Sequence, residues 1–265
     1  MDLGLANARV VITGGGSNIG RGIVHQFAAE GARIVISDID EPQSEKVRAE
    51  ALERGAAAVE LAIADLTTPE GAEGAIGRAV TAWGGIDVLV NNAGWSVPGF
   101  VATDTDREKW QRTIEVNLFT AIGATQCAIG PMKDSGGGSI VFIASDAAFG
   151  QIRQGVYGAS KAAMVALART TAREHGRHGI RSNIICPGLV VPDGPDAIGA
   201  SSLWAVGEDE VFNPKQIDFM LKDTPMRRLT TADDVGRAVL WFASPLAARQ
   251  VTGQMISVSG GYTMP

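Results

Sequence analysis

Residues 9–31 read RVVITGGGSNIGRGIVHQFAAEG, and this stretch carries the pattern from which the fold follows. An apolar, β-branched run ends at a cluster of three glycines, and apolar residues then recur every four positions from Ile19 to Phe27, until Gly31. The pattern predicts a buried strand, a tight turn and a helix in direct succession. Glycines in such a turn let the backbone bend sharply and let an anion approach the helix N-terminus.

Strand and helix patterns continue to alternate along the chain. Several of the expected strands are apolar throughout, as in parallel sheets that helices cover on both faces. The alternation predicts one doubly wound (Rossmann) α/β domain over residues 1–265, with a seven-stranded parallel sheet flanked by helices. The expected strands are Arg9–Thr13, Arg33–Ser37, Ala58–Ile63, Ile86–Asn91, Ser139–Ala144, Ile180–Cys186 and Gln254–Val258.

Local signals mark where several helices begin and end. Asp40 before Pro42 predicts a helix start, and Gly55 predicts its end. The stretches 67–70 and 105–108 have the sequence of capping boxes, with Thr first and Glu fourth.

One long segment, residues 191–225, breaks the alternation and is irregular. A connection of this length inside a compact domain is typical of a lid or binding loop. We therefore expect a substrate lid here, and its large apolar residues are Trp204, Phe212, Phe219 and Met220.

Composition excludes several classes of protein. The net charge is −6 and no block is rich in Lys or Arg, which argues against a nucleic-acid partner. The two cysteines, Cys127 and Cys186, lie far apart, and neither a signal peptide nor a run of 18 apolar residues is present. We expect a cytoplasmic protein with no membrane partner. No metal site is expected, because His175 and His178 lack a nearby third ligand.

The glycine-rich turn predicts a dinucleotide site, and Asp38 predicts which dinucleotide. Asp38 ends the second strand, 18 residues after Gly20, where a carboxylate can accept hydrogen bonds from a ribose diol. The same charge would repel a 2′-phosphate, and Ser17 and Ile39 offer no positive charge to attract one. The sequence therefore favours NAD over NADP, with a simple turn-capping aspartate as the alternative.

Tyr157 and Lys161 form a second candidate site. A spacing of four places both side chains on one face of a helix. A nearby ammonium lowers the pKa of a phenol from its ordinary value of about 10, toward a range useful for proton transfer. The alternative is a chance surface pair.

With both features present, the chain resembles the short-chain dehydrogenase/reductase family over nearly its whole length. In that family the turn reads T-G-x-x-x-G-x-G, which Thr13, Gly14 and Gly20 fit, while Asn18 replaces the middle glycine. Asparagine tolerates a left-handed backbone better than most residues, so we expect the turn to survive the replacement.

The resemblance implies a set of cofactor-binding residues. Asp65 and Leu66 match the adenine-contacting pair, residues 91–94 match the fourth-strand motif, and residues 187–188 match the motif that flanks the nicotinamide. Residues 190–192 stand where a threonine often contacts the carboxamide. The full implied set is Gly14, Ser17, Asn18, Ile19, Asp38, Ile39, Asp65, Leu66, Asn92, Ala93, Gly94, Tyr157, Lys161, Pro187, Gly188 and Val190.

The resemblance also implies the catalytic residues Asn117, Ser145, Tyr157 and Lys161. Tyr157 would exchange the substrate proton, with its pKa lowered by Lys161, and Ser145 would hydrogen-bond the substrate oxygen. Asn117 would link Lys161 to solvent through a water. Two alternatives are structural: Ser145 capping a strand end, and Asn117 satisfying buried backbone at a helix kink.

Together these patterns predict an NAD-dependent oxidoreductase with a secondary alcohol or ketone as its small-molecule substrate, and the resemblance implies a homotetramer. The apolar character of the residues that follow the strands favours an apolar, cyclic or medium-sized substrate. One rival is a 3-oxoacyl carrier-protein reductase, and another is a non-catalytic NAD-binding regulator. Residues expected to face the substrate, besides the lid, are Trp95, Val97, Pro98, Phe100, Phe149, Gln151 and Ile152.

Overall fold

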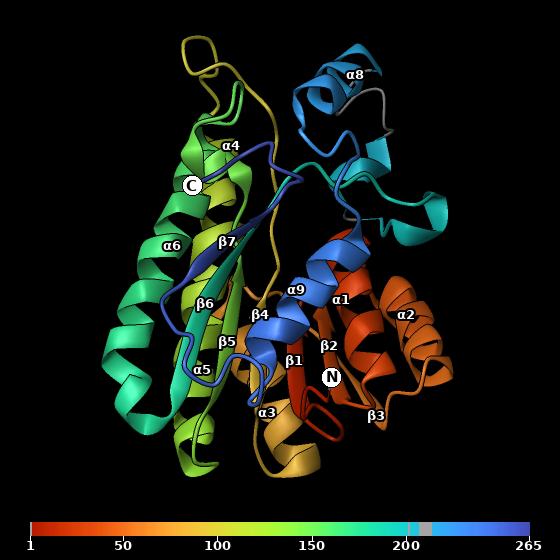
Figure 1. The fold of residues 1–265 in the computed structure, drawn as a ribbon, viewed down its shortest axis with the longest axis vertical. Coiled ribbons are helices and arrows are strands. Elements are labelled where there is room, and N and C mark those ends of the chain that lie inside the picture. Colours follow the sequence, from red (N-terminus) through yellow and green to blue (C-terminus); the bar gives the residue numbers. More distant parts are fainter. Residues whose placement is uncertain (1, 201, 207–213) are drawn as a thin grey trace.

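The computed structural model places a seven-stranded parallel sheet between two layers of helices (Figure 1). The structure describes residues 2–200, 202–206 and 214–265. The strand order is β3-β2-β1-β4-β5-β6-β7, and every neighbouring pair is parallel. The order reverses between β1 and β4, which creates a crevice at the carboxyl ends of these two strands.

The strands confirm the expected fold class, with ends that move by one or two residues. Ile86 precedes the fourth strand rather than opening it, since that strand begins at Val88. The bounds are β1 Arg9–Thr13, β2 Arg33–Asp38, β3 Ala58–Ile63, β4 Val88–Asn91, β5 Gly138–Ile143, β6 Ile180–Pro187 and β7 Met255–Val258.

Two apolar cores lie on the two faces of the sheet. Successive strand residues point to opposite faces, so Val10 and Ile12 enter one core while Val11 enters the other. The first core is closed by α1 (Asn18–Ala29), α2 (Glu41–Glu53) and α9 (Ala232–Ala243). The second is closed by α3 (Pro69–Trp83), α5 (Thr120–Asp134) and α6 (Gly155–His175). The shorter helices are α4 (Arg107–Ile114) and α8 (Pro214–Asp223).

The predicted helix ends are confirmed where glycine decides them. Gly31 and Gly55 follow α1 and α2 with φ of +72° and +105°, which non-glycine residues rarely adopt. Asp40 caps α2 by accepting a hydrogen bond from the Gln43 N–H at 3.1 Å. Both expected capping boxes are wrong by one residue, because the N-caps are Thr68 and Asp106.

The physical reason differs between the two caps. Pro69 suits the first helical position, so the residue before it becomes the cap, and the Thr67 hydroxyl donates to Asp65 instead. Ahead of α4, the Asp106 carboxylate accepts the Lys109 N–H at 3.0 Å in place of a Thr105 hydroxyl.

The lid segment, residues 191–225, is more regular than its sequence suggests. It contains the helix α8 and short 3-10 turns at Pro195–Ala197 and Leu203–Val206. Phe212 lies outside the described residues. Figure 1 shows α8 above the carboxyl ends of the strands, on the side where α1 and α9 begin.

A pair of side chains joins the ends of β1 and β4 at the reversal of strand order. The Thr13 Oγ1 accepts hydrogen bonds from the N–H groups of Asn92 and Ala93, at 2.9 and 3.0 Å. The Asn92 Nδ2 donates to the carbonyl oxygens of Thr13 and Gly14, both at 2.9 Å. The crevice walls are therefore held together at their base.

We predict that Gly20→Ala destabilises the fold, whereas Gly77→Ala stabilises it. A Cβ at Gly20 would overlap the Gly14 carbonyl oxygen and lie 2.8 Å from the Asn92 Nδ2, but a Cβ at Gly77 meets no described atom within 4 Å. Overpacking should cost about 2 kcal/mol at Gly20, and the helix propensity of alanine should add about 0.5–1 kcal/mol at Gly77. Chemical denaturation of both variants measures this, and equal effects of the same sign would contradict it.

Candidate active site

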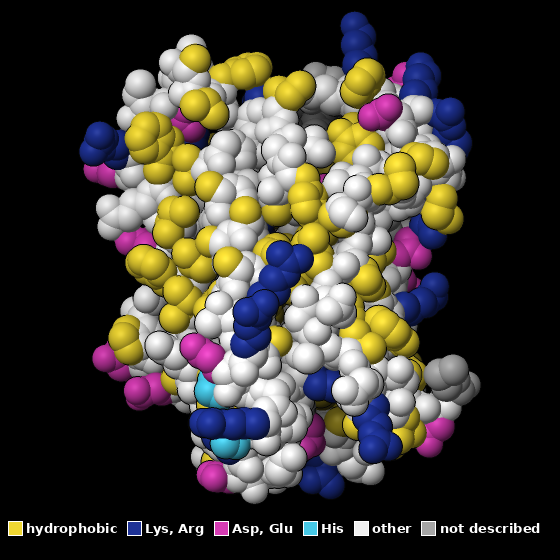
Figure 2. Space-filling view, turned by 60° about the vertical axis from the view of Figure 1, so that its left-hand side comes forward, with side chains coloured by type: hydrophobic (Ala, Val, Ile, Leu, Met, Phe, Trp, Pro, Cys, Tyr) yellow, Lys and Arg dark blue, Asp and Glu magenta, His cyan; other side chains and the backbone are white. Residues whose placement is uncertain are grey.

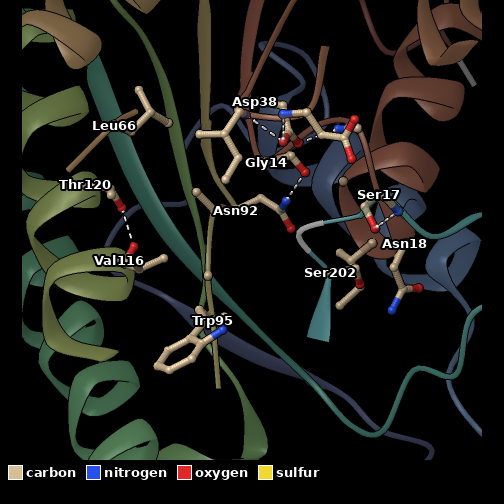
Figure 3. A pocket seen from close by; sticks show the side chains of 18 of the residues that line it. Gly14, Ser17, Asn18, Asp38, Leu66, Asn92, Trp95, Val116, Thr120 and Ser202 are labelled. Carbon is tan, nitrogen blue, oxygen red and sulfur yellow. Dashed lines mark hydrogen bonds between the residues drawn. The ribbon is translucent and has the colours of Figure 1, made fainter. Parts of the chain in front are cut away.

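A cleft of about 550 Å³ lies at the carboxyl ends of the central strands. In Figure 3 the turn residues Ser17 and Asn18 lie on one side of it, and Leu66 and Val116 lie on the other. The lining brings together most of the expected cofactor and catalytic residues: Gly14, Ser17, Asn18, Ile19, Asp38, Ile39, Asp65, Leu66, Asn92, Ala93, Gly94, Tyr157 and Lys161.

Five expected site residues are not part of this lining: Asn117, Ser145, Pro187, Gly188 and Val190. Pro187 ends β6, and the Gly188 N–H donates to the Val258 carbonyl at 3.0 Å. Val190 adjoins the glycine-rich turn, because its carbonyl accepts from the Asn18 Nδ2 at 3.3 Å.

The glycine-rich turn leaves the start of α1 facing the cleft. Gly14 has a φ of +62° and Asn18 a φ of +41°, so asparagine takes the left-handed conformation at the place where the family's glycine is missing. Ser17 is the N-cap of α1, yet its hydroxyl makes no cap hydrogen bond. The positive end of the helix dipole is thus free of a side-chain cap, as an anion site requires.

Asp38 both braces the turn and lines the cleft. Its Oδ2 accepts the Gly16 N–H at 2.9 Å, and its Oδ1 accepts the N–H groups of Ile39 and Asp40 at 2.8 and 3.2 Å. Asp38 therefore caps the turn, as the structural alternative predicts. It is also part of the cleft lining, which is what a ribose-binding carboxylate requires.

The lid segment reaches the cleft near this carboxylate, through Gly199, Ser202 and Trp204. The Gly199 N–H donates to the Ser17 Oγ at 3.3 Å, and the Ala200 N–H donates to the Asp40 Oδ2 at 2.7 Å. These contacts join residues that are 182 and 160 positions apart, so sequence patterns did not reveal that Asp40 belongs to the lining.

Of the residues expected to face a substrate, Trp95 and Trp204 line this cleft. Phe219 is 67% exposed on α8, and Ile152 is 82% exposed on the loop after β5. Outside the lining of this cleft lie Val97, Pro98, Phe100, Phe149, Gln151, Ile152, Phe219 and Met220.

Tyr157 and Lys161 meet as the helical spacing predicts. The Lys161 Nζ lies 5.7 Å from the centroid of the Tyr157 ring. Lys161 is buried, and its ammonium donates to the Ile143 carbonyl oxygen at 2.9 Å. Ser145 caps the 3-10 turn Asp146–Phe149 by accepting the Ala147 N–H at 3.1 Å, which the structural alternative anticipates.

The expected effect of Lys161 on the Tyr157 pKa is wrong for the protein by itself. Burial raises the pKa of Tyr157 to about 12, although its hydrogen bond with Ser145 works in the opposite direction. Burial also lowers the pKa of Lys161 to about 8. Desolvation of the phenolate is the largest cause of the shift, so Tyr157 is a neutral phenol at neutral pH.

Asn117 lies in a π-helix, Glu115–Phe119, between α4 and α5. Its Oδ1 accepts the Trp95 N–H at 3.0 Å, and its Nδ2 donates to the carbonyls of Trp95 and Thr113 at 2.7 and 2.8 Å. A Cβ on Gly94 would lie 2.8 Å from the Asn117 Oδ1 and 3.2 Å from the Lys161 Nζ. Glycine at position 94 therefore allows both groups to approach the backbone after β4.

The helices after β4 contribute lining residues that sequence reasoning missed: Arg112, Glu115, Val116 and Thr120. The Arg112 guanidinium lies 5.4 Å from the centroid of the Trp95 ring. Helical periodicity shows which side of α4 is apolar, but not which polar residues turn toward a cleft.

Comparison with known proteins supports these observations. The family model described as Enoyl-(Acyl carrier protein) reductase matches residues 14–263. The chain is 34% identical to the (2S)-[(R)-hydroxy(phenyl)methyl]succinyl-CoA dehydrogenase subunit BbsD of Thauera aromatica, over 99% of both chains. It is also 34% identical to the 7α-hydroxysteroid dehydrogenase of Escherichia coli, over 95% of this chain and 92% of that one.

A solved structure has the same fold. It is a 7α-hydroxysteroid dehydrogenase complexed with NADH and 7-oxo glycochenodeoxycholic acid. It superposes with a TM-score of 0.88 at 34% identity, and the match covers 98% of this chain and 96% of that chain.

We predict that Tyr157 stays protonated well above pH 10 in the protein without ligands. The chain has two tyrosines, so the Tyr262→Phe variant isolates the phenol of Tyr157 in an ultraviolet titration. With a pKa of about 12, about a tenth of the phenol should be ionised at pH 11. Half-ionisation below pH 9 would instead show that the Lys161 charge dominates.

Proposed function

The chain belongs to the short-chain dehydrogenase/reductase family, and on that footing we propose that it transfers a hydride between NAD and a secondary alcohol or ketone with a mainly apolar body. One observation carries the proposal: a single cleft contains the glycine-rich turn and Asp38 together with Tyr157 and Lys161. A cofactor site and a proton-transfer site thus share one cavity, as hydride transfer coupled to proton transfer requires.

The residues present fit a nicotinamide dinucleotide. The uncapped start of α1 suits a pyrophosphate, because free N–H groups and the helix dipole favour anions there. Asp38 lies where a ribose diol would bind, and its charge opposes a 2′-phosphate. Asp65 and Leu66 line the cleft where the family's adenine contacts are expected. When bound, the cofactor accepts or supplies the hydride.

The chain's own residues handle the proton. The neutral phenol of Tyr157 can donate a proton to the oxygen of a ketone, which leaves the phenolate, and in the reverse direction the phenolate takes the proton of the alcohol. The Ser145 hydroxyl, which hydrogen-bonds with the phenol, holds the same oxygen as charge develops on it. Lys161 keeps a positive charge beside the phenol and holds the cofactor ribose.

Asn117 supports this arrangement from the π-helix. All three of its hydrogen bonds in the structure are to backbone groups, so it fixes the strand end at Trp95. In the role implied by the family, a water on Asn117 connects Lys161 to solvent.

A second candidate substrate class is an acyl thioester. The relative BbsD is named as a subunit of a (2S)-[(R)-hydroxy(phenyl)methyl]succinyl-CoA dehydrogenase, and the family model is described as an enoyl-(acyl carrier protein) reductase. Asp38 counts against the NADPH-dependent form of this activity. Initial rates with paired substrates, a cyclic secondary alcohol and a 3-hydroxyacyl-CoA, distinguish the two classes.

The proposal includes a homotetramer in the cytoplasm with no nucleic-acid or membrane partner. On the face shown in Figure 2, Lys and Arg side chains stand in separate small groups and form no continuous basic surface. No helix in the described part of the chain has the length and apolar character needed to span a membrane. Within the same residues, no group of three or more His, Cys, Asp or Glu side chains could hold a metal ion.

We predict that kcat/KM is at least tenfold higher with NAD than with NADP. Asp38→Asn should narrow this preference, because it removes the charge that repels a 2′-phosphate and keeps an oxygen to accept the Gly16 N–H. Initial rates with both cofactors measure the ratio, and Asp134→Asn on the exposed end of α5 is the matched control. A wild-type preference for NADP would contradict the assignment of Asp38.

We predict that Tyr157→Phe lowers kcat by about three orders of magnitude while NAD still binds. The phenylalanine keeps the ring but has no proton to exchange, and general acid–base catalysis contributes factors of about 10²–10⁴. Steady-state rates and calorimetric titration with NAD measure the two effects separately. Retained turnover would show that another group exchanges the proton.

A further inference from the structure

A buried carboxyl group lies directly behind the candidate catalytic serine. Asp146 follows Ser145 and opens the 3-10 turn Asp146–Phe149. It is 4% exposed, and none of the roles assigned above uses it. Because Ser145 accepts the next N–H of the same turn, a shift of Asp146 also shifts the serine.

A chain of hydrogen bonds joins this carboxyl to the C-terminal segment, residues 259–265. The Asp146 Oδ1 lies 3.2 Å from the Ser257 Oγ on β7, and the Ser257 Oγ lies 2.8 Å from the Ser259 Oγ. The Ser259 Oγ lies 3.2 Å from the Thr263 carbonyl oxygen. This chain of hydrogen bonds thus has three links, which join a carboxyl, two hydroxyls and a carbonyl in that order.

Counting protons shows which state of Asp146 completes the chain. Each link needs one proton, the Thr263 carbonyl can only accept, and Ser257 and Ser259 supply one proton each. The third proton must come from the carboxyl itself. A carboxylate at position 146 therefore leaves one of the three hydrogen bonds unmade. The neutral acid completes all three, because Asp146 donates to Ser257, Ser257 donates to Ser259, and Ser259 donates to the Thr263 carbonyl.

The surroundings also disfavour a charge on Asp146. The titratable groups that face it are Cys186 on β6 and Tyr262 in the C-terminal segment, and the pKa of each is raised, so both are neutral at neutral pH. From α6, which packs on the same turn, Lys161 directs its ammonium to the Ile143 carbonyl. Burial raises the pKa of Asp146 to about 6, against hydrogen bonds with Thr263 and Ser257 that lower it.

The C-terminal segment joins this chain of hydrogen bonds to the loop after β5. The Thr263 N–H donates to the Ser259 Oγ at 3.1 Å, which closes a turn around Tyr262. The Tyr262 hydroxyl then donates to the Gln151 Oε1 at 3.3 Å. Gln151 lies outside the cleft lining, on the loop after β5 that joins Ser145 to Tyr157.

We propose that Asp146 is a positioning residue whose neutral form clamps the C-terminal segment through Ser257 and Ser259, and thereby holds in place Tyr262, Gln151 and the loop that joins Ser145 to Tyr157. The substrate consequence rests on the proposed function, but the clamp itself does not. The clamp loosens as Asp146 loses its proton, so substrate binding weakens as pH rises through the carboxyl pKa.

Asp146→Asn tests the proton requirement, because the amide supplies a permanent donor to Ser257 at the same size. In the folded wild type the pKa of Asp146 lies above the ordinary value of 3.8. The free energy of unfolding therefore falls as pH rises between about 4 and 6, and the loss stays constant above that range. The Tm of Asp146→Asn minus that of the wild type should rise by several degrees from pH 4 to pH 7. Asp134→Asn, at an exposed position, should show no such rise.

Amide hydrogen exchange and steady-state kinetics both test the clamp. Exchange of residues 259–265, corrected for the intrinsic rate, should become faster in the wild type than in Asp146→Asn as pH rises from 5 to 8. Over the same range the substrate KM of the wild type should rise about fivefold relative to that variant, which is the factor for one net hydrogen bond. The ratio of their kcat values should change much less.

Ser257→Ala provides an independent variant, because it breaks the chain at its centre. Asp146→Asn should have no effect on exchange or KM in this background, and Ser257→Ala alone should remove the pH dependence. A Tm difference independent of pH, or equal exchange of the C-terminal segment in all variants, overturns the proposal. If no alcohol or ketone is turned over, the proposed function fails, while the Tm and exchange measurements still decide the clamp.

Discussion

The close approach of two backbone segments at the end of β1 is the constraint on which the rest of the molecule depends. Asn92 and Thr13 exchange hydrogen bonds across the ends of β4 and β1 and hold the crevice closed at its base. Gly20 packs against the Gly14 carbonyl so tightly that no side chain fits. This packing directs the start of α1 into the crevice, where the pyrophosphate is proposed to bind.

The opposite end of the cleft is governed by desolvation rather than by packing. Burial keeps Tyr157 neutral and brings the pKa of Lys161 close to the physiological range. The pair is therefore set for proton donation before any ligand binds. Asp146 extends the same principle behind the site, where burial raises the pKa of the carboxyl to about 6. Burial thus shifts the pKa of each of these three groups.

Much of this site could be predicted because its signals are local. The turn at Gly14, the left-handed Asn18 and the helical spacing of Tyr157 and Lys161 each depend on a few neighbouring residues. The caps of α3 and α4 were predicted one residue early, because several adjacent residues can accept the same N–H groups. The contacts of the lid segment and the hydrogen bonds of Asn117 join distant segments, so no local pattern reveals them.

By itself, the sequence determined the doubly wound parallel fold, the glycine-rich turn and the placement of Tyr157 and Lys161 on one face of a helix. These features depend on periodicity and spacing, which can be recognised in the sequence without knowledge of the folded structure. Only the tertiary structure decided the protonation of Tyr157, the residues that close the cleft and the link from Asp146 to the C-terminal segment. The reason is that desolvation and hydrogen-bond chains depend on which distant atoms exclude water from a group, and these atoms are assembled only when the sheet and its helices pack.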